Sequence, residues 1–232
     1  MASFVAPTRA FTDEQLAFLK SVDSPTIANA VEPFELRERT DGYIGGNIGC
    51  LYPDLGVMVG QALTVKVSNP AGPVAGRDGY WAMWEALEQM PKPAVIVMQD
   101  ISGAPHRCAY AGEVMATLAT KLGAVGMVSD GGYRDIDEVH ALGLHYFCPF
   151  AVVAHGNFAI QDVGQPVWID GQRVLTGDIL HGDVNGIVIV PQETLAGLPG
   201  AVEEIRVRER RVMDYIKSDK FNLADFKVGK TY

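Results

Sequence analysis

The sequence predicts an α/β fold, and two observations about its elements carry that prediction. A helix, a buried strand and a second helix alternate between residues 113 and 142. Strand patterns dominate from residue 152 to residue 190. Hydrophobic residues make up 48% of the 232 residues and charged residues 20%, a composition typical of a folded protein with a core. In α/β folds chemistry gathers where strands turn into helices, so we expect the functional groups at such turns.

Helices open the chain. Thr12 and Gln15 have the spacing of a capping box and predict a helix as far as Lys20. A second helix is expected to begin at Ser24-Pro25, which gives an N-terminal helical segment over about residues 12–31. The elements expected next are a glycine-rich loop at 40–57, a strand at 59–68, a helix at 80–89 and a buried strand at 94–98.

The middle of the chain is its most regular part. We expect a helix over residues 113–122 with Gly123 as its C-terminal cap, followed by a buried strand at 125–129. The turn Asp130-Gly131-Gly132 then leads to a helix over residues 135–142.

Strands and one long helix complete the expected elements. The strands are expected at residues 152–156, 166–171 and 186–190. A C-terminal helix and tail are expected over about residues 193–232: a charged helix over roughly 193–217, then a polar tail from Ser218. Because the tail has few apolar anchors, we expect it to pack on another surface, such as that of a neighbouring subunit. Residues 1–232 are expected to form a single domain.

Charge and cysteine content limit the classes of function. Nineteen basic and 28 acidic side chains give a net charge of −9, without a basic run, so nucleic acid is not an expected partner. Three widely spaced cysteines are typical of a reducing compartment. With neither a secretory signal pattern nor an apolar run of membrane-spanning length, we expect a cytoplasmic protein.

Two short polar segments are the candidates for chemistry, because the standard nucleotide, zinc-protease and serine-hydrolase motifs are absent from the sequence. Asp135 and Glu138 have capping-box spacing, which by itself explains both acids as helix caps. Capping does not explain Arg134, since a cation at a helix N-terminus is unfavourable unless it binds an anion. Arg134 thus offers a guanidinium that can bind a carboxylate through two hydrogen bonds, and Asp135 offers an oxygen ligand for a hard divalent cation.

The second segment is Gly112-Glu113, at the expected start of the helix over residues 113–122. Glycine permits close backbone approach, and the free N–H groups of the first helical turn hold anions. The alternative is that the pair merely opens the helix.

In combination these segments match a family pattern. Gly112-Glu113, twenty residues and then Arg134-Asp135 resemble the RraA-like family, which includes the regulator of ribonuclease E activity A and the 4-hydroxy-4-methyl-2-oxoglutarate / 4-carboxy-4-hydroxy-2-oxoadipate aldolases. The resemblance extends over roughly residues 15–215, including GQALTV at 60–65, PVWIDG at 166–171 and DVNGIVIVP at 183–191. It implies a layered β/β/α sandwich that assembles as a homotrimer or a homohexamer.

The resemblance also implies roles for individual residues. Asp135 is expected to bind Mg²⁺ or Mn²⁺, and Arg134 to bind the pyruvyl part of the substrate and stabilise its enolate. Glu113 is expected to position a water that shuttles the proton. The substrate carboxylate is expected on the backbone of Gly112, Val114 and Met115. Glu209 of a neighbouring subunit is the best match for an acid that reaches the water shell of the metal, although Glu203 and Glu204 lie close by in the sequence.

The function implied by the resemblance is that of a divalent-metal-dependent class II pyruvate aldolase. It would cleave a 4-hydroxy-2-oxo diacid to pyruvate and also decarboxylate oxaloacetate. The alternative is a non-catalytic binding regulator of ribonuclease E. One departure concerns the substrate: many aldolases of the family carry an aromatic residue before the Gly-acid pair, where this chain has Ala111.

Overall fold

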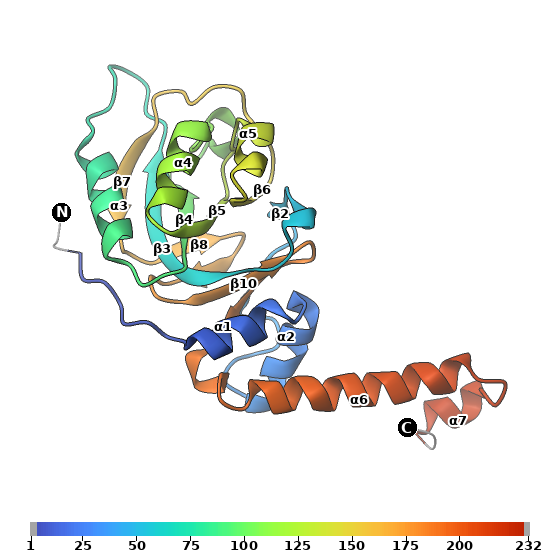
Figure 1. The fold of residues 1–232 in the computed structure, drawn as a ribbon. Helices are drawn as coiled ribbons and strands as arrows, with labels where there is room; N and C mark the ends of the chain where they lie inside the picture. The colour runs from blue at the N-terminus through green and yellow to red at the C-terminus, as the bar shows by residue number, and fades with distance from the viewer. Residues whose placement is uncertain (1–3, 230–232) are drawn as a thin grey trace.

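The computed structural model describes residues 4–229, and one large mixed sheet forms its centre (Figure 1). The sheet has nine strands in the order β1-β11-β10-β3-β4-β5-β6-β2, and β7 pairs with β3 outside this path. Neighbours β3, β4, β5 and β6 are parallel, and the other pairs are antiparallel. The strands are β1 (Tyr43–Ile44), β2 (Gly49–Cys50), β3 (Met58–Ser68), β4 (Ala94–Asp100), β5 (Ala124–Ser129), β6 (His145–Cys148), β7 (Ala159–Val163), β10 (Ile179–Asp183) and β11 (Gly186–Val190).

Side chains of the parallel strands alternate between two apolar layers. Leu63, Ile96 and Met127 pack against the helices α3 (Asp78–Gln89), α4 (Glu113–Lys121) and α5 (Ile136–Ala141). Val95 and Val128 point to the opposite face, where the ribbon of β8 (Val167–Ile169) and β9 (Gln172–Val174) covers the sheet. Because both faces are buried, these strands are continuously apolar in sequence. The β/β/α layering that the sequence analysis expected is therefore confirmed.

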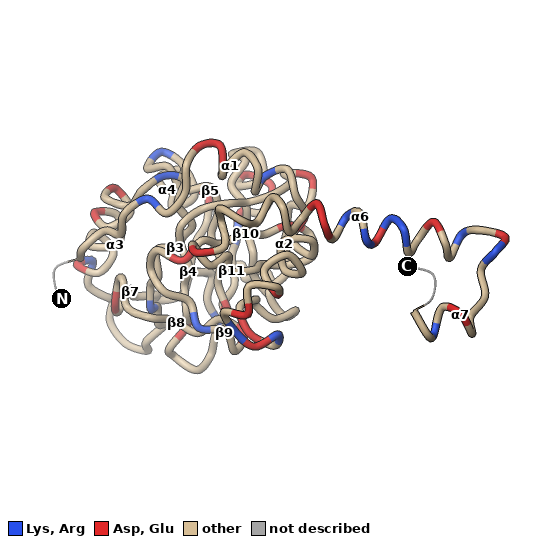
Figure 2. Tube along the Cα trace, turned by 90° about the horizontal axis from the view of Figure 1, so that it is seen from below, with Lys and Arg blue, Asp and Glu red and all other residues tan. Residues whose placement is uncertain are grey.

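The helices α1 (Asp13–Lys20) and α2 (Ser24–Val31) form a third apolar cluster with the start of α6 (Leu198–Lys217). Thr12 caps α1 and completes the predicted capping box with Gln15. Leu198, Val202 and Ile205 are buried, whereas the later turns of α6 extend away from the sheet (Figure 1). Basic and acidic residues are interspersed along this extended part (Figure 2).

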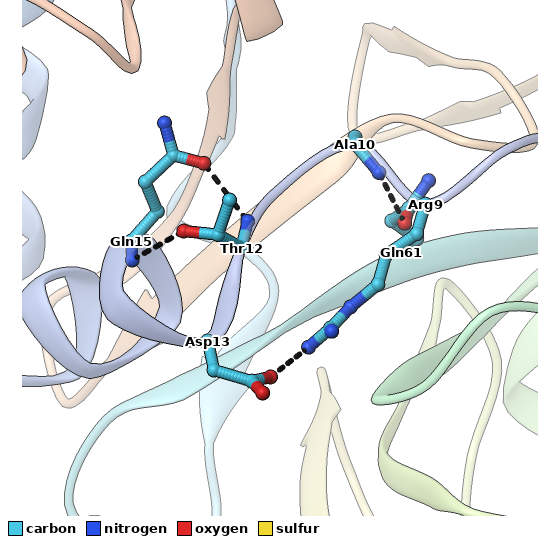
Figure 3. A network of polar contacts seen from close by, with 6 residues as sticks. All are labelled: Arg9, Ala10, Thr12, Asp13, Gln15 and Gln61. Atoms are coloured by element: carbon cyan, nitrogen blue, oxygen red, sulfur yellow. Dashed lines mark hydrogen bonds and ion pairs between the residues drawn. The ribbon is translucent and has the colours of Figure 1, made fainter.

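The segment before α1 is tied to the centre of the sheet. The buried Gln61 of β3 accepts a hydrogen bond from the N–H of Ala10 at 3.0 Å (Figure 3). Its side-chain amide also donates to the carbonyl oxygens of Thr8 and Gly177. Arg9 forms an ion pair with Asp13 at 2.6 Å, also visible in Figure 3. A buried amide thus connects the N-terminal segment to β3 and to the turn before β10.

Three expectations about single elements were wrong. Residues 152–156 form no strand, because their backbone pairs with two neighbouring turns: the N–H of Val152 donates to the carbonyl of Tyr133, and the N–H of Ala109 donates to that of Ala154. The loop expected at residues 40–57 contains the two-residue strands β1 and β2 and a 3-10 turn, Pro53–Leu55.

The third concerns the C-terminal part. The charged helix begins at Leu198 rather than at residue 193, since a separate 3-10 turn, Gln192–Thr194, precedes it. The tail forms a short helix, α7 (Leu223–Lys227), whose Phe226 ring stacks on Tyr215 of α6 with centroids 6.2 Å apart. Its aromatic side chains anchor it to its own chain.

Cys50, Cys108 and Cys148 are free thiols. Between residues 4 and 229, no helix combines the length and the apolarity needed to cross a bilayer.

Candidate active site

A cavity of about 450 Å³ lies at the carboxyl ends of the parallel strands. Its walls come from the loops that follow β3, β4, β5 and β6, which meet at one edge of the sheet because the strands are parallel. The lining residues fall in residues 74–80, 109–115 and 155–160, together with Arg134. The cavity lies where the sequence analysis expected the chemistry.

Backbone hydrogen bonds bring the two predicted segments together. The N–H of Arg134 donates to the carbonyl of Ala111 at 3.1 Å, and that of Tyr110 donates to Gly132 at 2.9 Å. The turn after β5 is thereby fastened beside the residues that lead into α4. Gly112-Glu113 and Arg134-Asp135, separated by twenty residues in the sequence, become neighbours.

Gly112 allows this close approach. A Cβ atom at this position would lie 2.4 Å from Asp135 Oδ2 and 2.9 Å from Arg134 Nε. The φ of Gly112 is −150°, an extended conformation that any residue adopts, so the requirement for glycine is one of space.

The start of α4 presents free backbone donors to the cavity. Gly112 is the N-cap residue and, lacking a side chain, makes no side-chain cap hydrogen bond. Among the described residues, no protein acceptor is found for the N–H groups of Gly112, Val114 and Met115, and all three residues line the cavity. Unpaired N–H groups at the positive end of a helix form an anion site.

Asp135 does not cap its own helix, so the capping-box interpretation of Asp135 and Glu138 was wrong. Asp135 has φ +57° and ψ +50°, a left-handed conformation that turns its carboxylate away from α5. Its Oδ2 accepts a hydrogen bond from the N–H of Glu113 at 2.8 Å and lies 3.6 Å from Arg134 Nε. Asp135 therefore caps the neighbouring helix α4, and strained backbone of this kind is typical of functional sites.

The other predicted residues lie around this turn. The side chain of Arg134 is 36% exposed and lines the cavity, whereas that of Asp135, 34% exposed, lies beside Arg134 and is not among the lining residues. Glu113 is exposed, and its carboxylate has no hydrogen-bond partner among the described residues. Glu209 lies exposed on the extended part of α6, so within one chain the structure does not bring it to the cavity.

The free carboxylate oxygen of Asp135 suits a metal ion that keeps most of its water ligands. Within residues 4–229 no group of three or more His, Cys, Asp or Glu side chains is arranged to share a metal ion. One oxygen of Asp135 is engaged by Glu113, and Oδ1 has no protein partner in the described chain. A single half-buried carboxylate oxygen fits Mg²⁺ or Mn²⁺, since Mg²⁺ binds through one or two carboxylates and retains several waters.

Tyr110, Asp100 and Asp130 form a hydrogen-bonded network next to two residues that line the cavity. Tyr110, between the lining residues Ala109 and Ala111, donates its hydroxyl to Asp100 at the end of β4. Asp130, which follows β5, accepts the N–H of Asp100 at 2.6 Å. Burial, with a smaller contribution from the charge of Asp100, raises the pKa of Asp130 to about 7. The network connects the loops that follow two neighbouring strands.

Sequence reasoning missed one wall of the cavity. Arg77, Tyr80, His155 and Asn157 also line it, and they come from the segments that follow β3 and β6. They lie in or beside segments that carry no motif, so their sequence neighbourhood gives no signal. The available signal was the position of the loop after β3, which lies at the same edge of the sheet as the loops that carry the predicted residues.

Comparisons with known proteins agree with this architecture. A family model described as Aldolase/RraA, of the RraA-like type, matches residues 24–189. A Halalkalibacterium halodurans protein named "Putative 4-hydroxy-4-methyl-2-oxoglutarate aldolase" is 28% identical over 164 residues, which are 68% of this chain and 73% of that protein. Protein DlpA of Legionella pneumophila is 25% identical over 134 residues, 57% of this chain; the match spans only 22% of that longer protein.

A solved structure shows the same fold. Streptomyces coelicolor RraAS2, described as an unusual member of the RNase ES inhibitor RraA protein family, superposes with a TM-score of 0.67 at 22% identity. The superposition covers 93% of this chain and 100% of that one. Since the family model matches more than half of the sequence, the chain belongs to the RraA-like family.

Proposed function

We propose that the protein is a divalent-metal-dependent class II pyruvate aldolase. It cleaves a 4-hydroxy-2-oxo diacid similar to 4-hydroxy-4-methyl-2-oxoglutarate to give pyruvate, and it also decarboxylates oxaloacetate. The name of the Halalkalibacterium relative supports the aldol reaction.

The observation that carries the proposal is the convergence of one guanidinium and three free N–H groups on one cavity. Arg134 and the backbone donors of Gly112, Val114 and Met115 all line it. A 2-oxo acid presents a carboxylate and an adjacent carbonyl oxygen, and these donors match both groups. The carboxylate of Asp135, fastened by Glu113, lies next to Arg134.

The reaction requires charge stabilisation on the 2-oxo oxygen and the movement of one proton. The C4 hydroxyl loses its proton, the C3–C4 bond breaks, and its electron pair enters the enolate of pyruvate. Arg134 stabilises the negative charge that develops on the enolate oxygen, while the N–H groups hold the carboxylate in place. Glu113 positions a water that carries the proton from the C4 hydroxyl, and C3 of the enolate finally takes up a proton.

Asp135 is the residue proposed to hold Mg²⁺ or Mn²⁺. When bound, such a cation would act as a Lewis acid and would stabilise the negative charge of the enolate. Oxaloacetate decarboxylation produces the same enolate, with CO₂ as the leaving group in place of a carbonyl compound. The groups that stabilise the enolate therefore serve both reactions.

We also propose a homotrimer or homohexamer in which Glu209 of a neighbouring subunit approaches the metal water shell. The extended part of α6 supports this arrangement, because it projects from the sheet of its own chain and carries exposed apolar side chains, including Met213 and Ile216.

A substrate panel with and without metal tests the proposal. We expect EDTA to abolish pyruvate release from 4-hydroxy-2-oxo diacids and from oxaloacetate, and Mg²⁺ or Mn²⁺ to restore it. Oxalate, which resembles the planar enolate, is expected to inhibit competitively. Reactions that contain metal but no protein give the background rate. Full activity in a chelated sample would contradict the metal-dependent mechanism.

The alternative function, a non-catalytic regulator of ribonuclease E, gives different results in the same assays. It requires neither turnover above the metal-only background nor oxalate binding at Arg134. If both are absent, and the protein instead lowers the activity of ribonuclease E in a cleavage assay, the regulator replaces the aldolase as the proposed function.

A further inference from the structure

The cavity carries a second guanidinium besides that of Arg134. Arg77 immediately precedes α3 and lines the cavity together with Tyr80. Its guanidinium carbon lies 4.6 Å from the centre of the Tyr80 ring and 5.4 Å from that of Trp81. Within the described chain Arg77 has no acidic partner within ion-pair distance. Aromatic rings thus orient this cation without neutralising its charge.

The loop leading to Arg77 is fastened to the adjacent wall. The side-chain amide of Asn157 donates to the carbonyl oxygens of Pro70 and Pro73, at 3.1 and 2.8 Å. Its oxygen accepts the N–H of Ala75 at 2.8 Å. The N–H of Asn157 donates to the side chain of Asn69, also at 2.8 Å. Four hydrogen bonds therefore hold the segment that carries Arg77 in a defined position.

Among the described residues that line the cavity, the acidic and strongly basic ones are represented by arginine alone. The sequence has a net charge of −9, yet no Asp or Glu is found among the described residues that line the cavity. Its two arginines, Arg77 and Arg134, come from different loops. Small residues, including Ala109, Ala111 and Gly112, also line the cavity, which leaves room for a ligand. Guanidinium groups pair with carboxylates through two parallel hydrogen bonds.

We propose that Arg77 binds the distal carboxylate of a dicarboxylate substrate, while Arg134 binds its 2-oxo acid end. Arg77 is then the residue that makes the site specific for diacids over monoacids. This inference rests on the proposed aldolase function, which assigns the 2-oxo acid end of the substrate to Arg134 and so leaves the distal carboxylate for Arg77. The dicarboxylate preference itself follows from the two guanidinium groups and the absence of lining acids.

A matched pair of substrates isolates the distal carboxylate. 4-Hydroxy-2-oxoglutarate and 4-hydroxy-2-oxopentanoate differ in that a methyl group replaces this carboxylate in the second. For Arg77→Gln we expect the ratio of kcat/KM for the diacid to that for the monoacid to fall by at least about tenfold, mainly through a higher KM for the diacid. Arg77→Lys is expected to give an intermediate ratio, because it keeps the charge but loses the fork.

The control is a second arginine stacked on an aromatic ring. Arg173 lies 5.9 Å from the centre of the Trp168 ring and does not line the cavity. Arg173→Gln is expected to leave the specificity ratio at its wild-type value. A ratio that is unchanged in Arg77→Gln, or that falls equally in both variants, overturns the proposal.

Binding of unreactive ligands separates this inference from the aldolase proposal. In the presence of Mg²⁺, calorimetry with 2-oxoglutarate and 2-oxopentanoate compares a diacid with a monoacid without bond cleavage. We expect the wild-type protein to bind the diacid more tightly and Arg77→Gln to lose that preference. If this holds while no substrate is turned over, the aldolase proposal fails and the dicarboxylate site stands. Equal affinities in the wild-type protein overturn the inference even if turnover is found.

Discussion

Asp135 shows how one residue serves two helices. It lies at the start of α5, but its left-handed backbone directs the carboxylate to the N–H of Glu113 at the start of α4. An acid at a helix N-terminus stabilises that helix. Within the described residues, the other oxygen of this carboxylate, Oδ1, has no protein partner and can bind a cation.

For Asp135→Asn we expect loss of the metal-dependent activity with the fold retained. Asparagine keeps an oxygen to accept the N–H of Glu113 but loses the charge that binds a divalent cation. Turnover is expected to fall by about 10²-fold or more, and the free energy of unfolding by about 1 kcal/mol. Asp137→Asn, an exposed acid in the first turn of α5, is the control. Near-normal activity of Asp135→Asn would show that the residue only caps α4.

Arg134→Lys tests the geometry of the guanidinium rather than its charge. Lysine cannot reproduce the two-pronged contact with a carboxylate and the adjacent oxygen. We expect kcat to fall by about 10²- to 10³-fold. Thermal unfolding is expected to change little, because the side chain is half-buried at the cavity edge and is not part of the core. A variant with wild-type kcat would contradict the role of Arg134 in the reaction.

Gly112→Ala tests the close approach of the two segments. The added Cβ would lie 2.4 Å from Asp135 Oδ2, so either the carboxylate or the start of α4 must move. We expect a loss of about 1–3 kcal/mol in the free energy of unfolding together with a loss of activity. Gly46→Ala is the control, because nothing lies within 4 Å of a Cβ at that exposed glycine. Equal effects in the two variants, measured by urea unfolding and by turnover, would contradict the steric argument.

At the scale of elements, the loops after β4 and β5 share a buried acid network. Tyr110 binds Asp100, and the N–H of Asp100 binds Asp130. Burial raises the pKa of Asp130 to about 7, well above its usual value of 3.8. Between these pH values the folded protein binds a proton that the unfolded chain releases. Asp130 therefore contributes a stability that is fully present below pH 4 and is lost as the pH rises through 7.

Asp130→Asn is expected to remove this part of the pH dependence. Asparagine keeps the oxygen that accepts the N–H of Asp100 and carries no charge to bury. The variant should gain stability relative to the wild-type protein between pH 5 and pH 8, by an amount on the order of 2–4 kcal/mol. Urea midpoints measured for both proteins at the two pH values test this. Parallel pH dependence in the two proteins would contradict the raised pKa of Asp130.

At the scale of the whole molecule, α6 separates a packed part from an exposed part. Its first turns bury Leu198, Val202 and Ile205 against α1 and α2, and its later turns extend with α7 away from the sheet (Figures 1 and 2). Exposed apolar side chains on a projecting element mark an interaction surface. A second copy of the chain is the partner that the proposed shared site requires.

Light scattering tests this assembly. Chains of 25.0 kDa are expected to form particles of about 75 kDa for a trimer or about 150 kDa for a hexamer. A shared site also predicts that specific activity falls on dilution below the dissociation range. A monomer that keeps full activity at working concentration would contradict any role of Glu209 from a neighbouring subunit.

Sequence patterns alone determined much of the fold and one wall of the site. Periodicity and capping signals located the helices α1 and α4 and the strands β3, β4 and β5 to within a few residues, because these signals are local. The pairs Gly112-Glu113 and Arg134-Asp135 were recognisable because their spacing along the chain matches a family pattern.

Tertiary structure decided which of these groups meet and what else joins them. Asp135 has capping spacing in the sequence, but its left-handed backbone sends the carboxylate to another helix. Arg77 carries no motif and reaches the cavity only because the loop after β3 ends at the same sheet edge as Arg134. Contacts between loops depend on the order of strands in the sheet, and that order arises from packing between segments far apart in the sequence.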